Sequence, residues 1–521
     1  MAPIVRVKQG LLKGYVERNV AGGEFFCFRG IPFAEPPVGE LRFQDPQPAK
    51  SWKGIREAVQ DGGESVQQDI VSKEVIGGED CLYLNVSTES FDKPKPVMFW
   101  IHGGSFVVGS NSHEIFRPDY LIKHGVVFVS TNYRLGFLGF SNLDHPLVSG
   151  NQGLKDLKAA LQWVQENIRS FGGDPENVTI FGGSAGSSCV HYLCVSPSSK
   201  GLFHKAIMQS HSLFNPPSFR KNSLPLGFKM AAILEKETSD VEELVTFFRS
   251  LPLKELMEAQ SKITTNLTLD DLEMTVGPSI DDKSPTPFCA ISGMELAKQG
   301  IRVPLIIGFN SFEGALKLIN HRENWHEWLE DHFEEILKTV AKVRNVCGKP
   351  EIVKIIKDMY FEGGPVTSSH VNEYLHFMGD VTIYNGIQKV IELQADLETP
   401  TFVYKFVHVP KFSILETVTK TKVNESTHGD ELSCLFHIPK FTGDKSYQSG
   451  TMDYLVTERM TRMWTDFAKT GTPTPKIDDV ITRKWPPLTS SAKNYLEISE
   501  QLVPGINPNG DMWKKWKPLL E

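Results

Sequence analysis

The stretch Val178-Thr179-Ile180-Phe181-Gly182-Gly183-Ser184-Ala185-Gly186 is the most informative part of this chain. Its first four residues are mostly apolar and β-branched, which favours a buried strand. The glycines two residues before and two residues after Ser184 leave room for a sharp turn from strand to helix. A serine at the tip of such a turn points its hydroxyl outward. The pattern therefore predicts a nucleophile elbow, with Ser184 as the catalytic serine.

Composition and charge narrow the classes of function. The chain has 521 residues, of which 40% are hydrophobic and 23% are charged, as in ordinary globular proteins. Its net charge of −8 argues against a nucleic-acid partner, because phosphate binding requires a basic surface. No apolar run approaches the roughly 18 residues that a membrane helix needs. We therefore expect neither a nucleic-acid partner nor a transmembrane segment.

Apolar runs that alternate with a helical pattern predict a parallel sheet. Residues 97–101 and 126–130 are almost continuously apolar, which is typical of strands covered on both faces. Between residues 154 and 169, apolar side chains recur at intervals of three and four, as in a helix. The strand before Ser184 follows. This alternation predicts an α/β fold, with helices on both faces of a central, mostly parallel, twisted sheet.

After residue 220 the sequence predicts mainly helices, interrupted by strand-like runs at 304–308 and 402–407. One long amphipathic helix is predicted over residues 325–340, because its apolar side chains share one face: Trp325, Trp328, Leu329, Phe333, Ile336, Leu337 and Val340. We see no internal repeat and no low-complexity linker. A single domain over residues 1–521 is therefore expected, with helical insertions at roughly 220–300 and 320–400.

A catalytic serine requires a base and a carboxylate that orients the base. In a fold whose catalytic serine lies on a nucleophile elbow, the acid and then the histidine follow the serine along the chain, each after a strand. Glu313 follows the run 304–308, and His428 follows the run 402–407 and a short loop. A single glutamate or histidine in a loop is usually an ordinary surface residue. Their shared position after a strand leads us to predict the catalytic triad Ser184, Glu313 and His428.

The developing oxyanion requires backbone N–H donors near the serine. The glycine-rich segment His-Gly-Gly-Ser-Phe at 102–106 follows the early strand 97–101, and glycines let a backbone approach the substrate closely. We predict that the amides of Gly104, Ser105 and Ala185 form the oxyanion hole. This chemistry needs no cofactor and no metal.

Metal-dependent hydrolysis is the weaker enzymatic alternative. It would have to use histidines such as His321, His326 and His332, which do not share a helix face. No second histidine follows His326 at the spacing of a helical zinc motif. We therefore expect no metal site.

The motifs together resemble the type-B carboxylesterases, the α/β-hydrolase family that includes the cholinesterases. The resemblance extends over nearly the whole chain, through segments in the family's order: Phe28-Arg-Gly-Ile-Pro-Phe-Ala-Glu-Pro-Pro37, Glu79-Asp-Cys-Leu-Tyr-Leu-Asn-Val86, Asn132-Tyr-Arg-Leu-Gly136, Asn151-Gln-Gly-Leu-Lys-Asp156, Phe171-Gly-Gly-Asp-Pro175 and Trp464-Thr-Asp-Phe-Ala-Lys-Thr-Gly471. It implies the α/β-hydrolase fold, the same triad and the same oxyanion amides. It also implies a structural pair between Arg42 and Glu79.

Some departures from the family pattern indicate in which cellular compartment the protein resides. The family's first disulfide joins the cysteine at Cys81 to an upstream cysteine, but this chain has Glu-Ser-Val-Gln at 64–67. Cys81 is therefore expected to be a free thiol. The seven cysteines are an odd number with no close pairs, and no secretory signal is visible at the start of the sequence. These features resemble insect intracellular α-type esterases and lead us to expect a cytoplasmic location, unless a signal was removed from the start of the chain.

Other departures bear on the substrate. Cholinesterases carry a tryptophan before the Glu-Asp-Cys segment and an acidic residue before the serine, but residues 64–78 contain no aromatic and Gly183 is not acidic. Acetylcholine is therefore a poor candidate substrate. An acyl-pocket tryptophan of many insect esterases is replaced in the stretch with Pro216 and Pro217, which predicts a widened acyl pocket. His211 replaces a family glycine and is expected to be a packing or hydrogen-bonding residue.

The function expected from this resemblance is serine-dependent hydrolysis of small to medium apolar esters, such as xenobiotic, insecticide, hormone or lipid esters. Organophosphates are the expected covalent inhibitors, and roles in detoxification and insecticide resistance are implied. Two alternatives remain. One is an esterase that sequesters insecticides and turns over slowly. The other is a non-catalytic, neuroligin-like binding module.

Overall fold

The computed structural model describes residues 2–69, 72–216, 218–220, 222–264, 276–320 and 324–520. Among these residues, no helix is both long enough and apolar enough to cross a membrane.

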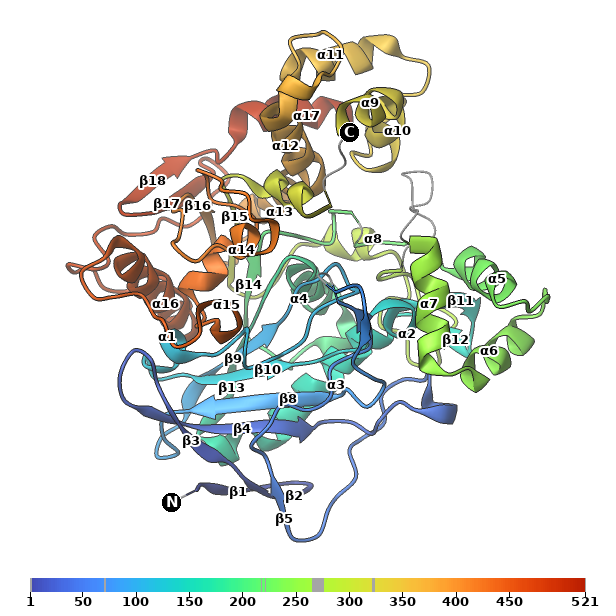
Figure 1. Ribbon diagram of the computed structural model, residues 1–521. Helices are drawn as coiled ribbons and strands as arrows, with labels where there is room; N and C mark the ends of the chain where they lie inside the picture. The colour runs from blue at the N-terminus through green and yellow to red at the C-terminus, as the bar shows by residue number, and fades with distance from the viewer. Residues whose placement is uncertain are drawn as a thin grey trace.

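A large mixed sheet runs through the centre of the molecule (Figure 1). Within the described residues it has 11 strands, in the spatial order β18 (Leu502–Ile506), β17 (Asn494–Ile498), β16 (Thr401–Phe406), β15 (Leu305–Asn310), β14 (Lys205–Gln209), β13 (Gly173–Gly183), β9 (Lys95–Ile101), β10 (Val127–Thr131), β8 (Tyr83–Thr88), β4 (Glu24–Pro32) and β3 (Tyr15–Arg18). Every neighbouring pair from β17 to β10 is parallel, and the outer pairs are antiparallel. The predicted central, mostly parallel sheet is confirmed.

Helices cover both faces of this sheet, because successive side chains of a strand point to opposite sides. Phe99 of β9 belongs to the core beneath two helices, and the next residue, Trp100, belongs to the core on the opposite face. The helices of the first face are α3 (Gln152–Asn167) and α4 (Ala185–Val195), and the main helix of the second is α16 (Met452–Thr470). The predicted helix at 154–169 corresponds to α3.

Two further groups of helices lie outside the sheet (Figure 1). The group near the right edge of the view contains α5 (Leu224–Ile233), α6 (Val241–Ser250) and α7 (Leu253–Thr264). The short α8 (Gly293–Ala297) packs against α4. The group at the top contains α9 (Trp325–Asp331), α10 (Phe333–Thr339), α11 (Pro350–Tyr360), α12 (Val371–Gly379) and α17 (Gly510–Leu520), and α13 (Asn385–Ala395) continues the line of α12 toward the sheet.

The remaining elements are short. The helices are α1 (Asp119–Ile122), α2 (Gly136–Phe140), α14 (Ile414–Thr419) and α15 (Pro439–Thr442). The strands form three small sheets, which are β1 (Ile4–Val7) with β2 (Gly10–Lys13) and β5 (Ile55–Glu57), β6 (Gln67–Gln68) with β7 (Val75–Ile76), and β11 (Asn142–His145) with β12 (Val148–Ser149).

The single helix predicted over 325–340 is wrong, because the chain leaves helical geometry at His332. This residue has φ −111° and ψ 13°, and it separates α9 from α10. Its imidazole Nδ1 lies 2.8 Å from the carbonyl oxygen of Trp328, and the two rings stack. The apolar face was assigned correctly, since Leu329 and Phe333 are both buried in a third core, together with Trp516 of α17. The bend lets both short helices pack against that core.

The expected pair between Arg42 and Glu79 is confirmed. Nε and Nη2 of the arginine donate to the two carboxylate oxygens at 2.6 and 2.7 Å. Nη1 also donates to the carbonyl oxygens of Phe248 and Leu251, at the end of α6. All of these partners satisfy the buried guanidinium, which thereby joins the amino-terminal region to the helical group of α5, α6 and α7.

Candidate active site

Ser184 lies on a strained turn between β13 and α4. Its backbone has φ 56° and ψ −128°, a conformation that costs about 1–3 kcal/mol for a residue with a side chain. The flanking glycines are sterically required: a methyl group at Gly182 would lie 2.8 Å, and one at Gly186 2.2 Å, from the carbonyl oxygen of Ile101. The predicted strand, turn and helix are therefore all present around Ser184.

Glu313 and His428 are in direct contact. Nδ1 of the imidazole lies 2.6 Å from Oε2 of the carboxylate. Glu313 follows β15 at the start of the 3₁₀ helix η5 (Glu313–Asn320), and His428 lies in the loop region after β16. The two loops are joined by a hydrogen bond from the amide of Phe312 to the carbonyl oxygen of Ser426, at 2.8 Å. Two side chains 115 residues apart in the sequence thus meet in the fold.

Both oxygens of Glu313 have partners, because Oε1 accepts a hydrogen bond of 2.7 Å from the amide of Asn310. The carboxylate is fully buried. Burial lowers the pKa of His428, but the charge of Glu313 and its hydrogen bond to the ring raise it, and the net shift is upward. The pair is therefore arranged to stabilise a protonated imidazole.

The strand register places the three predicted triad residues at one sheet edge. Gly183 of β13 is aligned with Gln209 of β14, and Gln209 with Gly308 of β15, so these parallel strands end together. The amide of Ser184 donates to the carbonyl oxygen of Gln209 at 2.8 Å, which fixes the turn to β14. Leu432, four residues after His428, lies near Gly183: a methyl group there would be 3.7 Å from its side chain.

The predicted oxyanion residues lie beside Ser184. Gly104 has φ 114°, and a methyl group on it would lie 1.9 Å from the carbonyl oxygen of Val108, so only glycine fits. Ser105 also has a positive φ, 53°. A methyl group at Gly103 would lie 3.0 Å from Cβ of Ser184, which shows how closely this loop approaches the elbow. Ala185 is the first residue of α4, where an amide has no partner within the helix.

A second buried carboxyl group, Glu431, lies next to the pair and was not predicted as a site residue. Its two oxygens accept hydrogen bonds from Nδ2 of Asn310 at 2.6 Å and Nε2 of Gln209 at 3.0 Å. Burial, followed by the nearby charge of Glu313, raises the pKa of Glu431 to about 7. Its position three residues after His428 was the available signal. No sequence pattern pointed to the amide side chains that hold it.

His211 is a buried hydrogen-bonding residue, as expected. Its Nδ1 lies 2.6 Å from Oγ of Ser188 on α4. Burial lowers the pKa of His211 to about 3, so the ring is neutral at physiological pH. Pro216 is described by the structure, whereas Pro217 lies outside the described residues.

Cys81 is a buried free thiol, as expected, and the other six cysteines are also free. His326 and His332 belong to no group of three potential metal ligands among the described residues, and His321 lies outside them.

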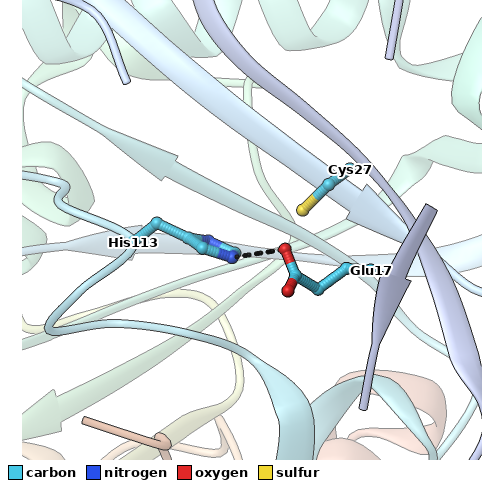
Figure 2. A group of neighbouring side chains, drawn as sticks. All are labelled: Glu17, Cys27 and His113. Carbon is cyan, nitrogen blue, oxygen red and sulfur yellow. Dashed lines mark ion pairs between the residues drawn. The ribbon is translucent and has the colours of Figure 1, made fainter. Parts of the chain in front are cut away.

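The one group of this kind in the described part of the chain consists of Glu17 on the edge strand β3, Cys27 on β4 and His113 in a turn outside the strands (Figure 2). Nε2 of His113 lies 3.4 Å from Oε2 of Glu17, and Cys27 contacts Oγ of Ser87 at 3.2 Å. Nη1 of Arg117 lies 3.6 Å from the other oxygen of Glu17. Because a guanidinium already compensates the carboxylate and would repel a cation, we assign this group a structural role.

The fold and this edge of the sheet define an α/β-hydrolase. The model of the carboxylesterase family matches residues 1–511. Carboxylesterase 3 from Homo sapiens is 33% identical over 500 residues, which cover 91% of this chain and 82% of that protein. Esterase FE4 from Myzus persicae is 31% identical over 517 residues, which cover 96% of this chain and 89% of that protein.

A crystal structure of juvenile hormone esterase from Manduca sexta, with OTFP covalently attached, superimposes with a TM-score of 0.87. It is 24% identical and covers 100% of this chain and 99% of its own, which supports the fold. The chain belongs to the carboxylesterase family, and it is an enzyme that hydrolyses carboxylic esters.

Proposed function

We propose that the protein hydrolyses small to medium apolar carboxylic esters through an acyl-enzyme on Ser184. The observation that carries this proposal is the contact of 2.6 Å between His428 Nδ1 and Glu313 Oε2, at the sheet edge where the strained turn of Ser184 lies. A buried carboxylate bonded to one ring nitrogen leaves the other nitrogen to act as a base.

In the proposed mechanism, the Ser184 hydroxyl attacks the ester carbonyl while His428 accepts its proton. Glu313 keeps Nδ1 protonated and stabilises the imidazolium. The amides of Gly104, Ser105 and Ala185 donate to the oxyanion, and each such donor is typically worth about 3 kcal/mol. The alcohol leaves with the proton of the imidazolium. Water then attacks the acyl group, with His428 again as base, and releases the acid.

The proposed substrates are xenobiotic, insecticide, hormone or lipid esters, and we propose that the acyl site accepts long or bulky acyl groups. The support is the proline stretch that begins at Pro216, where many insect esterases have tryptophan. A series of p-nitrophenyl esters from acetate to long acyl chains tests this. A maximum of kcat/KM beyond butyrate is expected, and a sharp fall after acetate would contradict the widened pocket.

Ser184→Ala tests the proposed nucleophile. The substitution should lower kcat roughly 10⁶-fold while the protein stays folded. A fluorophosphonate probe should label the wild-type protein and leave the variant unlabelled. Ser187→Ala, three residues further along α4, is the matched control and should be labelled normally. Turnover that survives in Ser184→Ala would disprove the mechanism, and failure of the wild type to label would favour a non-catalytic binding module.

Organophosphates are the proposed covalent inhibitors, because a phosphorylated serine mimics the tetrahedral intermediate. Ester turnover and sequestration are distinguished by pre-steady-state kinetics with an insecticide ester. Continued turnover after the first cycle is expected for a hydrolase, and a stoichiometric burst followed by negligible release would identify sequestration. We also propose a cytoplasmic location, supported by the seven free cysteines. Cell fractionation tests it.

A further inference from the structure

Tyr384 bridges the two ends of the short turn that carries Glu313. Its buried hydroxyl donates to the carbonyl oxygen of Asn310 at 2.7 Å and accepts from the amide of Glu313 at 3.3 Å. The same turn is closed by the bond from the Asn310 amide to the Glu313 carboxylate. The Tyr384 hydroxyl therefore contacts the backbone of both residues that set the orientation of the carboxylate, Asn310 and Glu313 itself.

Tyr384 reaches this turn because the helix that carries it is irregular. Between α12 and α13 the chain forms a π-helical segment, Asp380–Tyr384, in which the wider turn accommodates an additional residue. In an uninterrupted α-helix, one residue fewer would rotate the following side chains by about 100°. The π segment therefore determines which side chain at its carboxyl end faces the turn at Glu313. Such segments occur frequently at functional sites.

The helix approaches the turn at a contact between two glycines. A methyl group on Gly314 would lie 1.7 Å from the carbonyl oxygen of Leu375 and 2.7 Å from the amide nitrogen of Gly379. A methyl group on Gly379 would lie 3.1 Å from both the Gly314 nitrogen and Cε2 of Tyr384. The residue after Glu313 is therefore in backbone contact with α12. The position of the helix and the position of the carboxylate are coupled.

The opposite end of the π segment is held separately. The carboxyl group of Asp380 accepts hydrogen bonds from the hydroxyl of Tyr360 and, at 3.0 Å, from Nδ2 of Asn509. The indole of Trp516 donates to the Tyr360 hydroxyl at 2.7 Å. The Tyr360 hydroxyl thus binds the first residue of the π segment, whereas Tyr384 is its last residue, and of these two buried tyrosines Tyr384 is the one whose hydroxyl contacts the turn of Glu313.

We propose that Tyr384 is a positioning residue for the triad acid: its hydroxyl, delivered by the π segment, holds the turn Asn310–Glu313 so that the carboxylate faces Nδ1 of His428. This role rests on the proposed function. Tyr384 touches neither the substrate nor the reacting atoms. It acts through Glu313, and the Glu313 carboxylate in turn holds the imidazole and raises its pKa.

The decisive variant is Tyr384→Phe, which keeps the ring and its edge contact with Phe309 and removes only the hydroxyl. We expect kcat with p-nitrophenyl butyrate to fall roughly 10-fold to 100-fold with little change in KM, as for a small misplacement of a catalytic group. The acid limb of the pH profile of kcat/KM should move to lower pH, because a displaced carboxylate supports the imidazolium less.

Gly379→Ala is a second, independent variant. It keeps the Tyr384 hydroxyl and replaces a helical glycine by a better helix former, but its methyl group pushes against the tyrosine ring and Gly314. The same fall in kcat and the same shift of the acid limb are expected. This variant tests the proposal even if Tyr384→Phe folds poorly.

Tyr360→Phe is the matched control. It removes a buried tyrosine hydroxyl from the same helical layer and should lower the thermal midpoint, while kcat and the acid limb stay as in the wild type. The proposal is overturned if Tyr384→Phe keeps the wild-type kcat and acid limb, or if Tyr360→Phe reproduces both effects. Failure of the proposed function appears differently, as wild-type turnover that survives Ser184→Ala, and it would remove the positioning role as well.

Discussion

Two of the glutamate–histidine pairs in the described part of the chain, Glu313–His428 and Glu17–His113, have the same composition but different environments. Glu313 and His428 lie at the ends of parallel strands, 2.6 Å apart, with a completely buried carboxylate. Glu17 and His113 lie at the antiparallel side of the sheet, 3.4 Å apart, with a carboxylate side chain that is 21% exposed (Figure 2). Arg117 also contacts Glu17, at 3.6 Å.

The environments of the two carboxylates decide what each pair can do. The Glu313 carboxylate contacts the imidazole of His428 and accepts a hydrogen bond from the backbone amide of Asn310, and the pKa of His428 is raised as a net result. At Glu17, burial raises the pKa of the carboxyl group, but the contacts with His113 and Tyr15, followed by the charge of Arg117, outweigh it and lower that pKa to about 2. In the first pair, the charge of Glu313 stabilises the protonated form of His428, the proposed base. The second pair surrounds the Glu17 carboxylate with neighbours that stabilise its ionised form.

The largest difference between the pairs should appear when each histidine is replaced. His428→Asn removes the proposed general base and should lower kcat roughly 10⁶-fold, as in other triads. His113→Asn, the matched control, should leave kcat unchanged. Steady-state hydrolysis of p-nitrophenyl butyrate measures both. Comparable losses in the two variants would show that the pairs do not differ in function.

Replacing the carboxylates should give the next largest effect. Glu313→Gln keeps the shape but cannot stabilise the imidazolium and favours the wrong tautomer, so kcat should fall about 10⁴-fold. The measurement is kcat at the pH optimum, with the thermal midpoint as a check on folding. A loss of less than tenfold would contradict the assignment of Glu313 as the triad acid.

Glu431→Gln should have a smaller effect, visible mainly in the pH profile. The charge of Glu431 contributes to the raised pKa of His428, after burial and Glu313. Its removal lowers that pKa. Because the neutral imidazole is the active form, the acid limb of kcat/KM should move to lower pH, while kcat at the optimum changes less than tenfold. An acid limb that moves upward or stays in place would exclude this electrostatic role.

Glu17→Gln should have the smallest effect and should act on stability alone. A carboxyl group whose folded pKa is depressed stabilises the fold at pH values above its ordinary pKa of 4.5, and this contribution is lost as pH falls toward 2. The variant should lose about 1 kcal/mol at pH 7 and less at pH 3.5. Urea unfolding at both pH values measures this, and kcat should match the wild type. An altered kcat would assign the second pair a catalytic role.

The sequence predicted the positions that depend on strands and missed those that depend on packing. Glu313 and His428 could be located because parallel strands end at one edge, and Ser184 because its glycines are sterically required. Tyr384 could not, since its contact with the turn depends on a π segment that leaves no simple periodicity. The break at His332 was missed for a related reason: the apolar spacing is the same whether the helix is continuous or bent.

Helix α17 has a consequence for biosynthesis. Trp513 and Trp516 are buried among residues of α9 to α12, so this core is assembled from segments separated by well over a hundred positions. During translation the large sheet can begin to form while the ribosome is still reading the later codons. The third core cannot close until residues 510–520 have left the exit tunnel. Until then the apolar surface of this core is exposed, and exposed apolar surface makes an incomplete chain prone to aggregation.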